Sequence, residues 1–193
     1  MNSKAKHPKM GGNVKLQNTT FNPGSKIRLK DFDTRTTSGT TKEKSLAICE
    51  KNNTAIDELS YRLYAENTRA LLLVFQGMDT AGKDGAIRHV MQGVDAQAAE
   101  VHPFKKPSSL ELDHDFLWRI HQKVPARGNI GIFNRSHYED VLVVRVHNLV
   151  PRKEWSSRYD RINDFEKLLT DSGITILKFF LHISKEEQRE RLQ

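Results

Sequence analysis

The strongest constraint on the fold is the run Gly77–Lys83 (GMDTAGK), which closely follows the apolar run 70–75 (ALLLVF). The apolar run is short, and polar residues and a glycine bound it, so it predicts a strand buried on both faces. Residues 84–92 predict a helix directly after the loop. Backbone N–H groups converge on phosphate oxygens in this context of a buried strand, a glycine-bounded loop and a helix.

We therefore predict a phosphate-binding loop here, in preference to an ordinary tight turn after a strand. The expected phosphate contacts come from the loop backbone, at Gly77, Thr80, Ala81 and Gly82. Lys83 would place a full positive charge on the transferred or bridging phosphate.

Two aspartates depart from the usual form of such a loop. Asp84 follows Lys83, where a Ser or Thr hydroxyl normally contacts Mg²⁺. Asp79 lies inside the loop, where phosphate would repel a carboxylate unless a cation lay between them. We interpret Asp79 as a ligand of Mg²⁺, direct or through water, with Mg²⁺ as the expected cofactor. The alternative is an aspartate that only stabilises the turn.

A second motif follows the apolar run 130–133 at once, in residues 134–140 (NRSHYED). The corresponding motif of phosphate-loop enzymes usually ends in Asp, whereas this chain has Asn134, which can orient a metal-bound water but brings no charge. Glu139 and Asp140 either supply the missing carboxylate or only complement the dipole of the helix that they begin.

The same motif contains Ser136 and His137. We expect a structural or binding role for His137, because phosphoryl transfer between phosphates needs no general base. Arg135 stands at the carboxyl end of a predicted strand, which faces the ligand crevice in sheets of this class. A planar guanidinium there suits bidentate contact with phosphate.

A third basic group lies in the loop after the predicted strand 98–104. Prolines flank Lys105 and Lys106 and keep them extended, and Arg119 adds a further cation. A channel with several cations suits a substrate with several phosphates, although scattered surface lysine and arginine would give the same composition.

Predicted strands and helices alternate along the chain. In addition to the strand and the helix that flank the phosphate loop, helices are expected at 45–64, 110–124, 138–146 and 154–169. Further strands are expected at 98–104, 129–133 and 174–183. Gly173 is expected to cap a helix, and Ser184 to begin a capping box with Glu187. This alternation predicts an α/β fold, a three-layer sandwich with a parallel sheet and helices on both faces.

The net charge of +7 over 193 residues is unevenly distributed. Residues 1–45 contain ten Lys or Arg against three Asp or Glu, and the other residues are balanced. We predict a basic, partly extended arm at 1–44 and a phosphotransferase domain at 45–193, with Phe21, Ile27, Leu29 and Phe32 able to dock the arm. A solvated arm is favoured over a nucleic-acid contact, so no specific nucleic-acid partner is expected.

The single cysteine, Cys49, excludes an intrachain disulfide and fits a reducing compartment. We interpret it as a small core residue. No apolar run approaches the ~20 residues of a membrane helix, and the N-terminus has no secretion signal. These observations predict a cytoplasmic protein without a membrane partner.

Several motifs in order resemble the polyphosphate kinase 2 family. They are the runs 77–85, 102–107 (HPFKKP), 114–119 (HDFLWR) and 132–146, the motifs in 155–159 (WxxRY) and 162–166 (INxFE), and the run 178–184 (KFFLHIS). The likeness extends from about residue 45 to the end of the chain.

The resemblance implies a P-loop kinase-like fold and a Mg²⁺-dependent transfer of the terminal phosphate between inorganic polyphosphate and a nucleotide (ADP, AMP or ATP). Asp79 then resembles the metal-linked acid, Lys83 the loop lysine and Arg135 the arginine that holds the transferring phosphate. Lys105 and Lys106 resemble polyphosphate contacts. Asn134 with Glu139 resembles the subgroup that accepts both nucleoside mono- and diphosphates. The family usually forms dimers or tetramers.

Two other functions use the same loop. An ATP-dependent small-molecule or nucleoside kinase would not need the basic run near Lys105, and a non-catalytic module would bind polyphosphate without turnover. The chain stops within a charged helix after Ser184, so we expect an N-terminal part without the family's lid and closing helices.

Overall fold

The computed structural model describes residues 20–22, 24–36 and 39–193. Its sheet has four parallel strands in the order β2-β3-β1-β4. They are β1 (Ala70–Gly77), β2 (Ala99–Pro103), β3 (Ile130–Asn134) and β4 (Ile174–Leu181). The central strands β1 and β3 are almost entirely buried, as their continuous apolar sequences predict.

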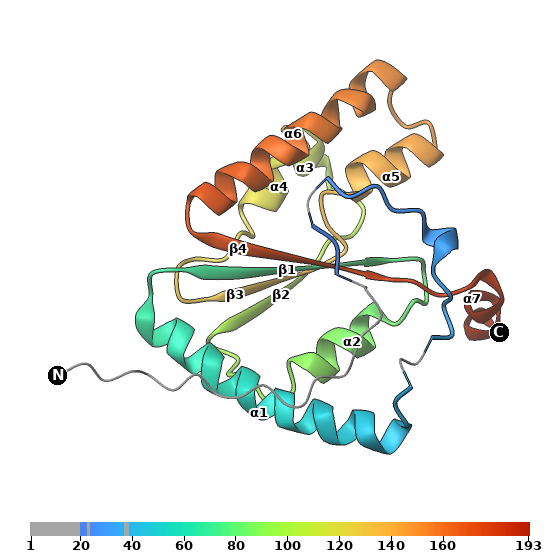
Figure 1. The fold of residues 1–193 in the computed structure, drawn as a ribbon. Coiled ribbons are helices and arrows are strands. Elements are labelled where there is room, and N and C mark those ends of the chain that lie inside the picture. Colours follow the sequence, from blue (N-terminus) through green and yellow to red (C-terminus); the bar gives the residue numbers. More distant parts are fainter. Residues whose placement is uncertain (1–19, 23, 37–38) are drawn as a thin grey trace.

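Helices cover both faces of this sheet (Figure 1). One face carries α1 (Lys42–Glu66) and α2 (Lys83–Val90), and the other carries α3 (Ser109–Leu112), α4 (Trp118–His121), α5 (Glu139–Val146) and α6 (Arg152–Asp171). The short helix α7 (Lys185–Leu192) lies beyond the end of β4. The predicted α/β sandwich with helices on both faces is confirmed.

The core has two parts, one on each face of the sheet. On one face Leu73 and Phe75 of β1 pack with Ile87 of α2. On the other face Leu72 of β1 packs with Phe165 of α6. Burial on both faces gives the central strands a fixed position, and the loops at their carboxyl ends are positioned with them.

The strand register brings those loops together. Phe75, near the end of β1, lies opposite Asn134 of β3, and Asn134 in turn lies opposite Pro103 of β2. Gly77 lies opposite Leu181 at the end of β4. Since all strands are parallel, the phosphate loop, the Arg135 turn and the loop after β2 share one edge of the sheet.

The predicted helix 110–124 is wrong in its extent, because the structure has two short helices, α3 and α4, in its place. Ser108 begins α3 with a complete capping box. The Asp115 carboxylate then accepts a hydrogen bond of 2.9 Å from the backbone N–H of Leu117, which is a local turn that competes with a continuous helix.

The helix predicted at 45–64 begins earlier, inside the predicted arm. Thr41 is its N-cap, and its side chain accepts a hydrogen bond from the backbone N–H of Lys44. Cys49 is partly buried in α1. The predicted C-terminal glycine cap of α6 is present at Gly173, whose φ is 90°. Ser184 caps α7 by accepting from the N–H of Glu187, which is one half of the predicted capping box, while the Glu187 carboxylate accepts from Arg191.

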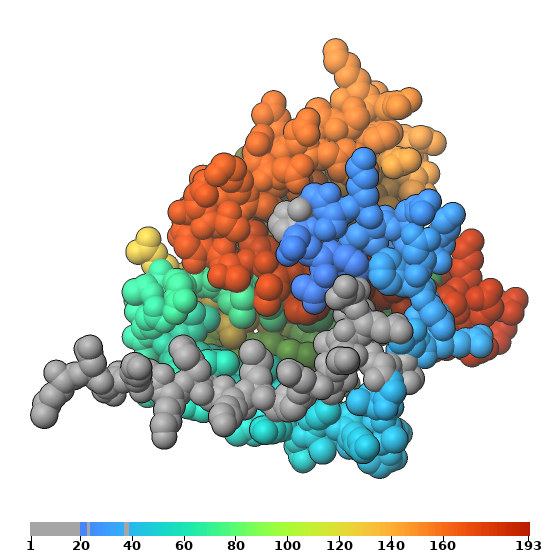
Figure 2. Space-filling model, in the orientation of Figure 1, coloured from blue at the N-terminus to red at the C-terminus, as the bar shows by residue number. Residues whose placement is uncertain are grey.

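The arm is described only in part, because residues 1–19 lie outside the described residues. Within it, Phe21 and Phe32 meet edge to face with ring centroids 5.4 Å apart. Phe21, Ile27 and Leu29 each remain more than 40% exposed. Figure 2 shows this segment, in blue, on the surface of the molecule. No helix among the described residues is both long and apolar enough to cross a membrane.

Candidate active site

The phosphate loop joins the end of β1 to the start of α2, as predicted. A Cβ atom added at Gly77 would lie 2.8 Å from the backbone oxygen of Leu181, so only glycine lets the loop leave the sheet this close to β4. Gly82 is the N-cap of α2 with a φ of 93°, a left-handed conformation that favours glycine. The free N–H groups of α2 therefore face the loop.

Lys83 is the buried cation of the loop, with only 8% of its surface exposed. Its Nζ donates hydrogen bonds of 3.0 and 3.1 Å to the backbone oxygens of Gly77 and Met78. Burial and the nearby Arg135 guanidinium lower the pKa of Lys83, while Asp79 and other acids oppose that shift. The ammonium is thus held inside the loop, where a phosphate would sit.

Asp79 and Arg135 meet across the site. The guanidinium of Arg135 donates a hydrogen bond of 2.8 Å to the carboxylate of Asp79, and both side chains are largely exposed. Arg135 has a φ of 64°, a conformation that is uncommon for a residue with a side chain. The turn after β3 therefore aims this guanidinium at the loop after β1.

The amide of Asn134 donates a hydrogen bond to the carboxylate of Asp84, which links the second motif to the start of α2. Among the described residues no cluster of three or more His, Cys, Asp or Glu side chains could hold a metal ion alone. Mg²⁺ commonly binds through one or two carboxylates together with substrate phosphates and water. The donor set of Asp79 and Asp84 beside a phosphate loop fits that chemistry.

Glu139 begins α5 and lies near both cations. Burial raises the pKa of Glu139, and Arg135 and Lys83 oppose that shift. When the amide oxygen of Gln76 faces Ser136, its nitrogen donates to the Glu139 carboxylate at 3.1 Å. Glu139 therefore lies beside the cations of the candidate site as well as at the start of α5, and its contribution of a carboxylate to the site stays a prediction.

Ser136 and His137 are fully buried beneath the Arg135 turn. The Nε2 atom of His137 lies 3.3 Å from the carboxylate of Glu166, which also accepts hydrogen bonds from the Tyr138 hydroxyl and from Lys178 at 2.7 Å. This network ties α6 and β4 to the turn that carries Arg135. The structural role expected for His137 agrees with this position.

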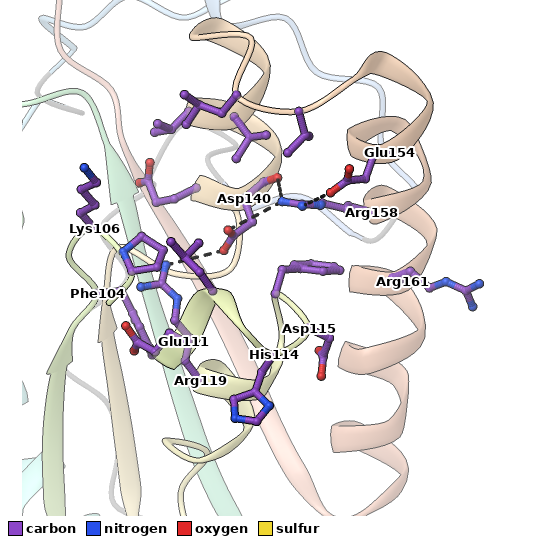
Figure 3. A pocket seen from close by; sticks show the side chains of 18 of the residues that line it. Phe104, Lys106, Glu111, His114, Asp115, Arg119, Asp140, Glu154, Arg158 and Arg161 are labelled. Atoms are coloured by element: carbon purple, nitrogen blue, oxygen red, sulfur yellow. Dashed lines mark hydrogen bonds and ion pairs between the residues drawn. The ribbon is translucent and has the colours of Figure 1, made fainter. Parts of the chain in front are cut away.

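A cavity of about 970 Å³ opens beside Arg135 and Glu139, on the face of the sheet covered by α3–α6 (Figure 3). Lys105 and Lys106 line it, as do Arg119, Arg158 and Arg161. Acidic side chains are also present, including Glu111 and Asp115. Arg135 links this cavity to the phosphate loop, because it lines the cavity and donates a hydrogen bond to Asp79.

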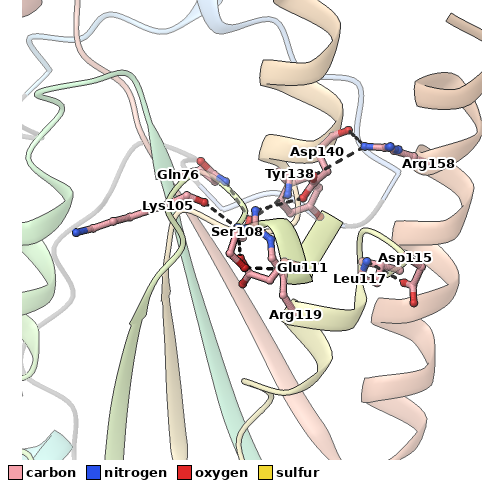
Figure 4. Close-up of polar contacts among 11 residues, drawn as sticks. Gln76, Lys105, Ser108, Glu111, Asp115, Leu117, Arg119, Tyr138, Asp140 and Arg158 are labelled. Carbon is pink, nitrogen blue, oxygen red and sulfur yellow. Dashed lines mark hydrogen bonds and ion pairs between the residues drawn. The ribbon is translucent and has the colours of Figure 1, made fainter. Parts of the chain in front are cut away.

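Arg119 is buried in the wall of this cavity (Figure 4). Its guanidinium donates a hydrogen bond of 2.8 Å to the backbone oxygen of Lys105 and lies 3.7 Å from the carboxylate of Asp140. Arg158 lies 3.8 Å from the same carboxylate. In Figure 4 the Lys105 side chain extends away from Arg119. Arg119 therefore supports the loop that contains Lys105 and Lys106 (the lysine loop). The contact of Arg119 with polyphosphate stays a prediction.

The sequence allows two roles for Asp140, as a metal-side acid or as a helix-start acid. It does not indicate that Asp140 is buried between two arginines. Burial raises the pKa of Asp140, and Arg119 and Arg158 oppose that shift. The sequence motifs include Glu166 and Lys178 but predict no role for them, and they do not include Gln76. All three are polar residues within an otherwise apolar strand or an amphipathic helix, and this pattern could have identified them.

The family model described as Polyphosphate kinase 2 matches residues 39–193. The chain belongs to the polyphosphate kinase 2 family. That range includes the phosphate loop, the second motif and every residue that lines the cavity.

Two relatives are 51% identical to this member of the polyphosphate kinase 2 family. One is an AMP/ADP-polyphosphate phosphotransferase from Meiothermus ruber, matched over 89% of this chain and 65% of its own length. The other is an ADP-polyphosphate phosphotransferase from Rhodopseudomonas palustris, matched over 70% of this chain and 51% of its own length. This chain thus spans about half to two thirds of each.

A solved structure shows the same fold. The crystal structure of Polyphosphate Kinase 2 from Arthrobacter aurescens TC1 aligns with a TM-score of 0.85 and 44% identity. The alignment covers 88% of this chain and 62% of that chain. The P-loop kinase-like fold implied by the family resemblance is thereby supported.

Proposed function

We propose that this chain belongs to an enzyme that transfers phosphate reversibly between inorganic polyphosphate and a nucleotide, from ADP to ATP or from AMP to ADP. The observation that carries the proposal is that Arg135 links the loop Gly77–Lys83 to a cavity lined by Lys105 and Lys106 at one edge of the sheet. The names of the two relatives described above agree with it.

The proposed mechanism is positioning and charge neutralisation, as in other phosphoryl transfers. The N–H groups at the start of α2 and the Lys83 ammonium hold one phosphate. Arg135 turns its planar guanidinium to the transferring group from the neighbouring strand. No covalent intermediate on the protein is required.

Mg²⁺ is the proposed cofactor, with Asp79 as the residue that would hold it, directly or through water. A bound Mg²⁺ would neutralise charge on the phosphates. The hydrogen bond between Arg135 and Asp79 would place the guanidinium beside the carboxylate that holds the cation, so that both would face the same phosphate. Asn134 and Asp84 would orient water at the same edge.

The acceptor is proposed to be either a nucleoside mono- or diphosphate, because Asn134 and Glu139 match the family subgroup with that range. The Meiothermus ruber relative, named for both AMP and ADP, supports this range. Lys105 and Lys106 are the proposed polyphosphate contacts. A cytoplasmic homodimer or homotetramer is the proposed form of the enzyme.

Donor and acceptor can be separated in one assay with the full-length protein and Mg²⁺. Polyphosphate as sole donor is expected to convert ADP to ATP and AMP to ADP, measured by coupled luminescence and chromatography. Phosphorylation of a nucleoside by ATP without any use of polyphosphate would instead identify an ordinary kinase. Tight polyphosphate binding without turnover would identify a binding module.

The lysine loop has a matched control on the other face of the sheet. Replacing Lys105 and Lys106 with Ala should raise the KM for long polyphosphate about tenfold or more, because two phosphate contacts are lost. Replacing the exposed Lys44 and Lys51 of α1 removes the same charge far from the cavity and should leave that KM unchanged. Equal effects of the two pairs would contradict a polyphosphate path along Lys105 and Lys106.

A further inference from the structure

An anion-binding loop turns its backbone N–H groups toward the anion, so its carbonyl oxygens must point elsewhere. Each of those oxygens then needs a hydrogen-bond donor or water. In this loop the backbone oxygens of four successive residues, 77–80, all accept hydrogen bonds from side chains. Two separate parts of the chain provide the donors.

Lys83 serves the first two oxygens, those of Gly77 and Met78. The same ammonium is the group that would hold a bound phosphate in the proposed function. An ammonium has three N–H donors, so the two carbonyls leave one for a bound phosphate, and a phosphate that takes a second bond displaces a carbonyl. Lys83 is therefore shared between the loop and the ligand.

The helix α7 serves the other two oxygens. The amide of Gln188 donates a hydrogen bond of 3.0 Å to the backbone oxygen of Asp79. The guanidinium of Arg191 donates one of 3.0 Å to the backbone oxygen of Thr80, and Glu187 holds that guanidinium at 2.7 Å. These donors lie about 110 residues from the loop in sequence.

The Thr80 carbonyl belongs to the most strained part of the loop. Thr80 has a φ of 63°, which is a true outlier for a β-branched residue. Its hydroxyl oxygen is buried and finds no hydrogen-bond partner among the described residues. A Cβ atom added at Gly82 would lie 3.5 Å from the Arg191 guanidinium, so this side chain also borders the start of α2.

We propose that Gln188 and Arg191 are positioning residues that hold the phosphate loop in its phosphate-binding conformation through the carbonyls of Asp79 and Thr80. The choice of polyphosphate as the anion rests on the proposed function. The two bonds from α7 do not involve the ammonium that meets the phosphate, so they hold the strained turn in the phosphate-bound loop as well. Phosphate affinity then depends on α7, although neither side chain has to touch the phosphate.

The test compares variants of the full-length protein. They are Gln188→Ala, Arg191→Ala, the double variant and Arg191→Lys, which keeps an N–H donor. The matched control is Arg189→Ala, since Arg189 is exposed on the same helix. Its charge helps to lower the pKa of Glu186, which lies on α7 and not on the loop. Tripolyphosphate binding is measured by calorimetry, the melting temperature by circular dichroism, and KM and kcat with polyphosphate and ADP.

The double variant is expected to bind tripolyphosphate about tenfold more weakly, with a matching rise in KM and a smaller change in kcat. Arg191→Lys should recover part of the loss, and Arg189→Ala should bind like the parent. The melting temperature should change little, because α7 buries no residue. If the double variant does not fold, Gln188→Ala alone decides by the same binding criterion.

A folded double variant that binds tripolyphosphate within twofold of the parent would overturn the proposal, as would an equal loss in Arg189→Ala. A parent protein that binds no tripolyphosphate would overturn it too. Binding that depends on α7 without any transfer to nucleotide would support the role of α7 and contradict only the proposed function.

Discussion

The Arg135 side chain is expected to matter for function much more than for stability. Its ion pair with Asp79 is open to solvent, since 46% of the Arg135 side chain and 73% of the Asp79 side chain are exposed. Pairs of this kind contribute about 0–1 kcal/mol to stability. The guanidinium is thus held at the site by the backbone turn after β3 more than by its partner, and it is free to meet a phosphate.

Replacing Arg135 with Ala should lower kcat by about 10²–10³ through loss of charge stabilisation, with little change in melting temperature. Arg135→Lys should restore only part of the rate, because an ammonium cannot bind phosphate in a bidentate way. Steady-state kinetics and thermal unfolding of both variants check this. Wild-type kcat in Arg135→Ala would remove Arg135 from the mechanism.

Glu166 is the hub beneath that turn. Burial alone would raise its pKa, but hydrogen bonds from His137, Lys178 and Tyr138 outweigh burial and lower the pKa of Glu166 to about 2. Burial, together with the hydrogen bond to Glu166, raises the pKa of Tyr138. The charged carboxylate is therefore the form that holds α6, β4 and the Arg135 turn together.

The low pKa of Glu166 has a consequence for acid stability. Its folded value lies below the ordinary 4.5, so its stabilisation is fully present above about pH 4.5 and is lost as the pH falls toward 2. At neutral pH Glu166→Gln should cost on the order of 3 kcal/mol, at about 1.4 kcal/mol per pKa unit. Urea unfolding across pH 3–7 should show the gap to wild type narrowing on acidification. A gap that stays constant over that range would show that Glu166 titrates normally.

At the residue scale the sequence predicted the groups of the phosphate site better than their support. Asp79, Lys83 and Arg135 were predicted from their places after strands, and the structure brings them together. The burial of Arg119 against Asp140 was not predictable from the sequence. A cation in a basic stretch is typical of the surface, and the acidic partner of Arg119 lies on another helix.

Among the elements, the close approach of β1 and β4 determines where the phosphate loop can leave the sheet. Gly77→Ala would push a methyl group against the Leu181 backbone oxygen at 2.8 Å, and the Cβ atoms of Ala81 and Leu181, at 3.1 and 3.2 Å, limit relaxation. Overpacking of this kind costs about 1–3 kcal/mol. The shift should also displace the loop and weaken phosphate binding.

Gly85 in α2 provides the matched control, since a Cβ there meets nothing within 4 Å. Gly85→Ala should be neutral or should stabilise the helix by about 0.5–1 kcal/mol. Chemical denaturation of both variants checks the pair. The account of the strand exit is wrong if Gly77→Ala unfolds at the same denaturant concentration as Gly85→Ala.

Element type was predictable where periodicity was strong and unreliable where a side chain competed with it. The parallel strands and their flanking helices follow from alternating apolar runs, and the structure confirms them. The helix predicted at 110–124 was wrong because the Asp115 turn interrupts it. The contacts of Gln188 and Arg191 with the loop depend on chain geometry that no local pattern carries.

For the whole molecule, the sheet gathers three loops, each following a different strand, at one edge. The loop after β1 would bind phosphate, the turn after β3 adds Arg135, and the loop after β2 carries Lys105 and Lys106, which line the cavity. Membership of the polyphosphate kinase 2 family agrees with that arrangement. We propose that the loop Gly77–Lys83 holds the phosphate that passes from polyphosphate to a nucleotide.

The most direct test follows ATP formation from ADP, with Mg²⁺ and polyphosphate as the only phosphate donor, in the full-length protein and its Lys83→Ala variant. The account predicts ATP formation by the parent and a loss of at least about 10³-fold in the variant, with its fold intact by circular dichroism. Undiminished ATP formation by Lys83→Ala would contradict the account.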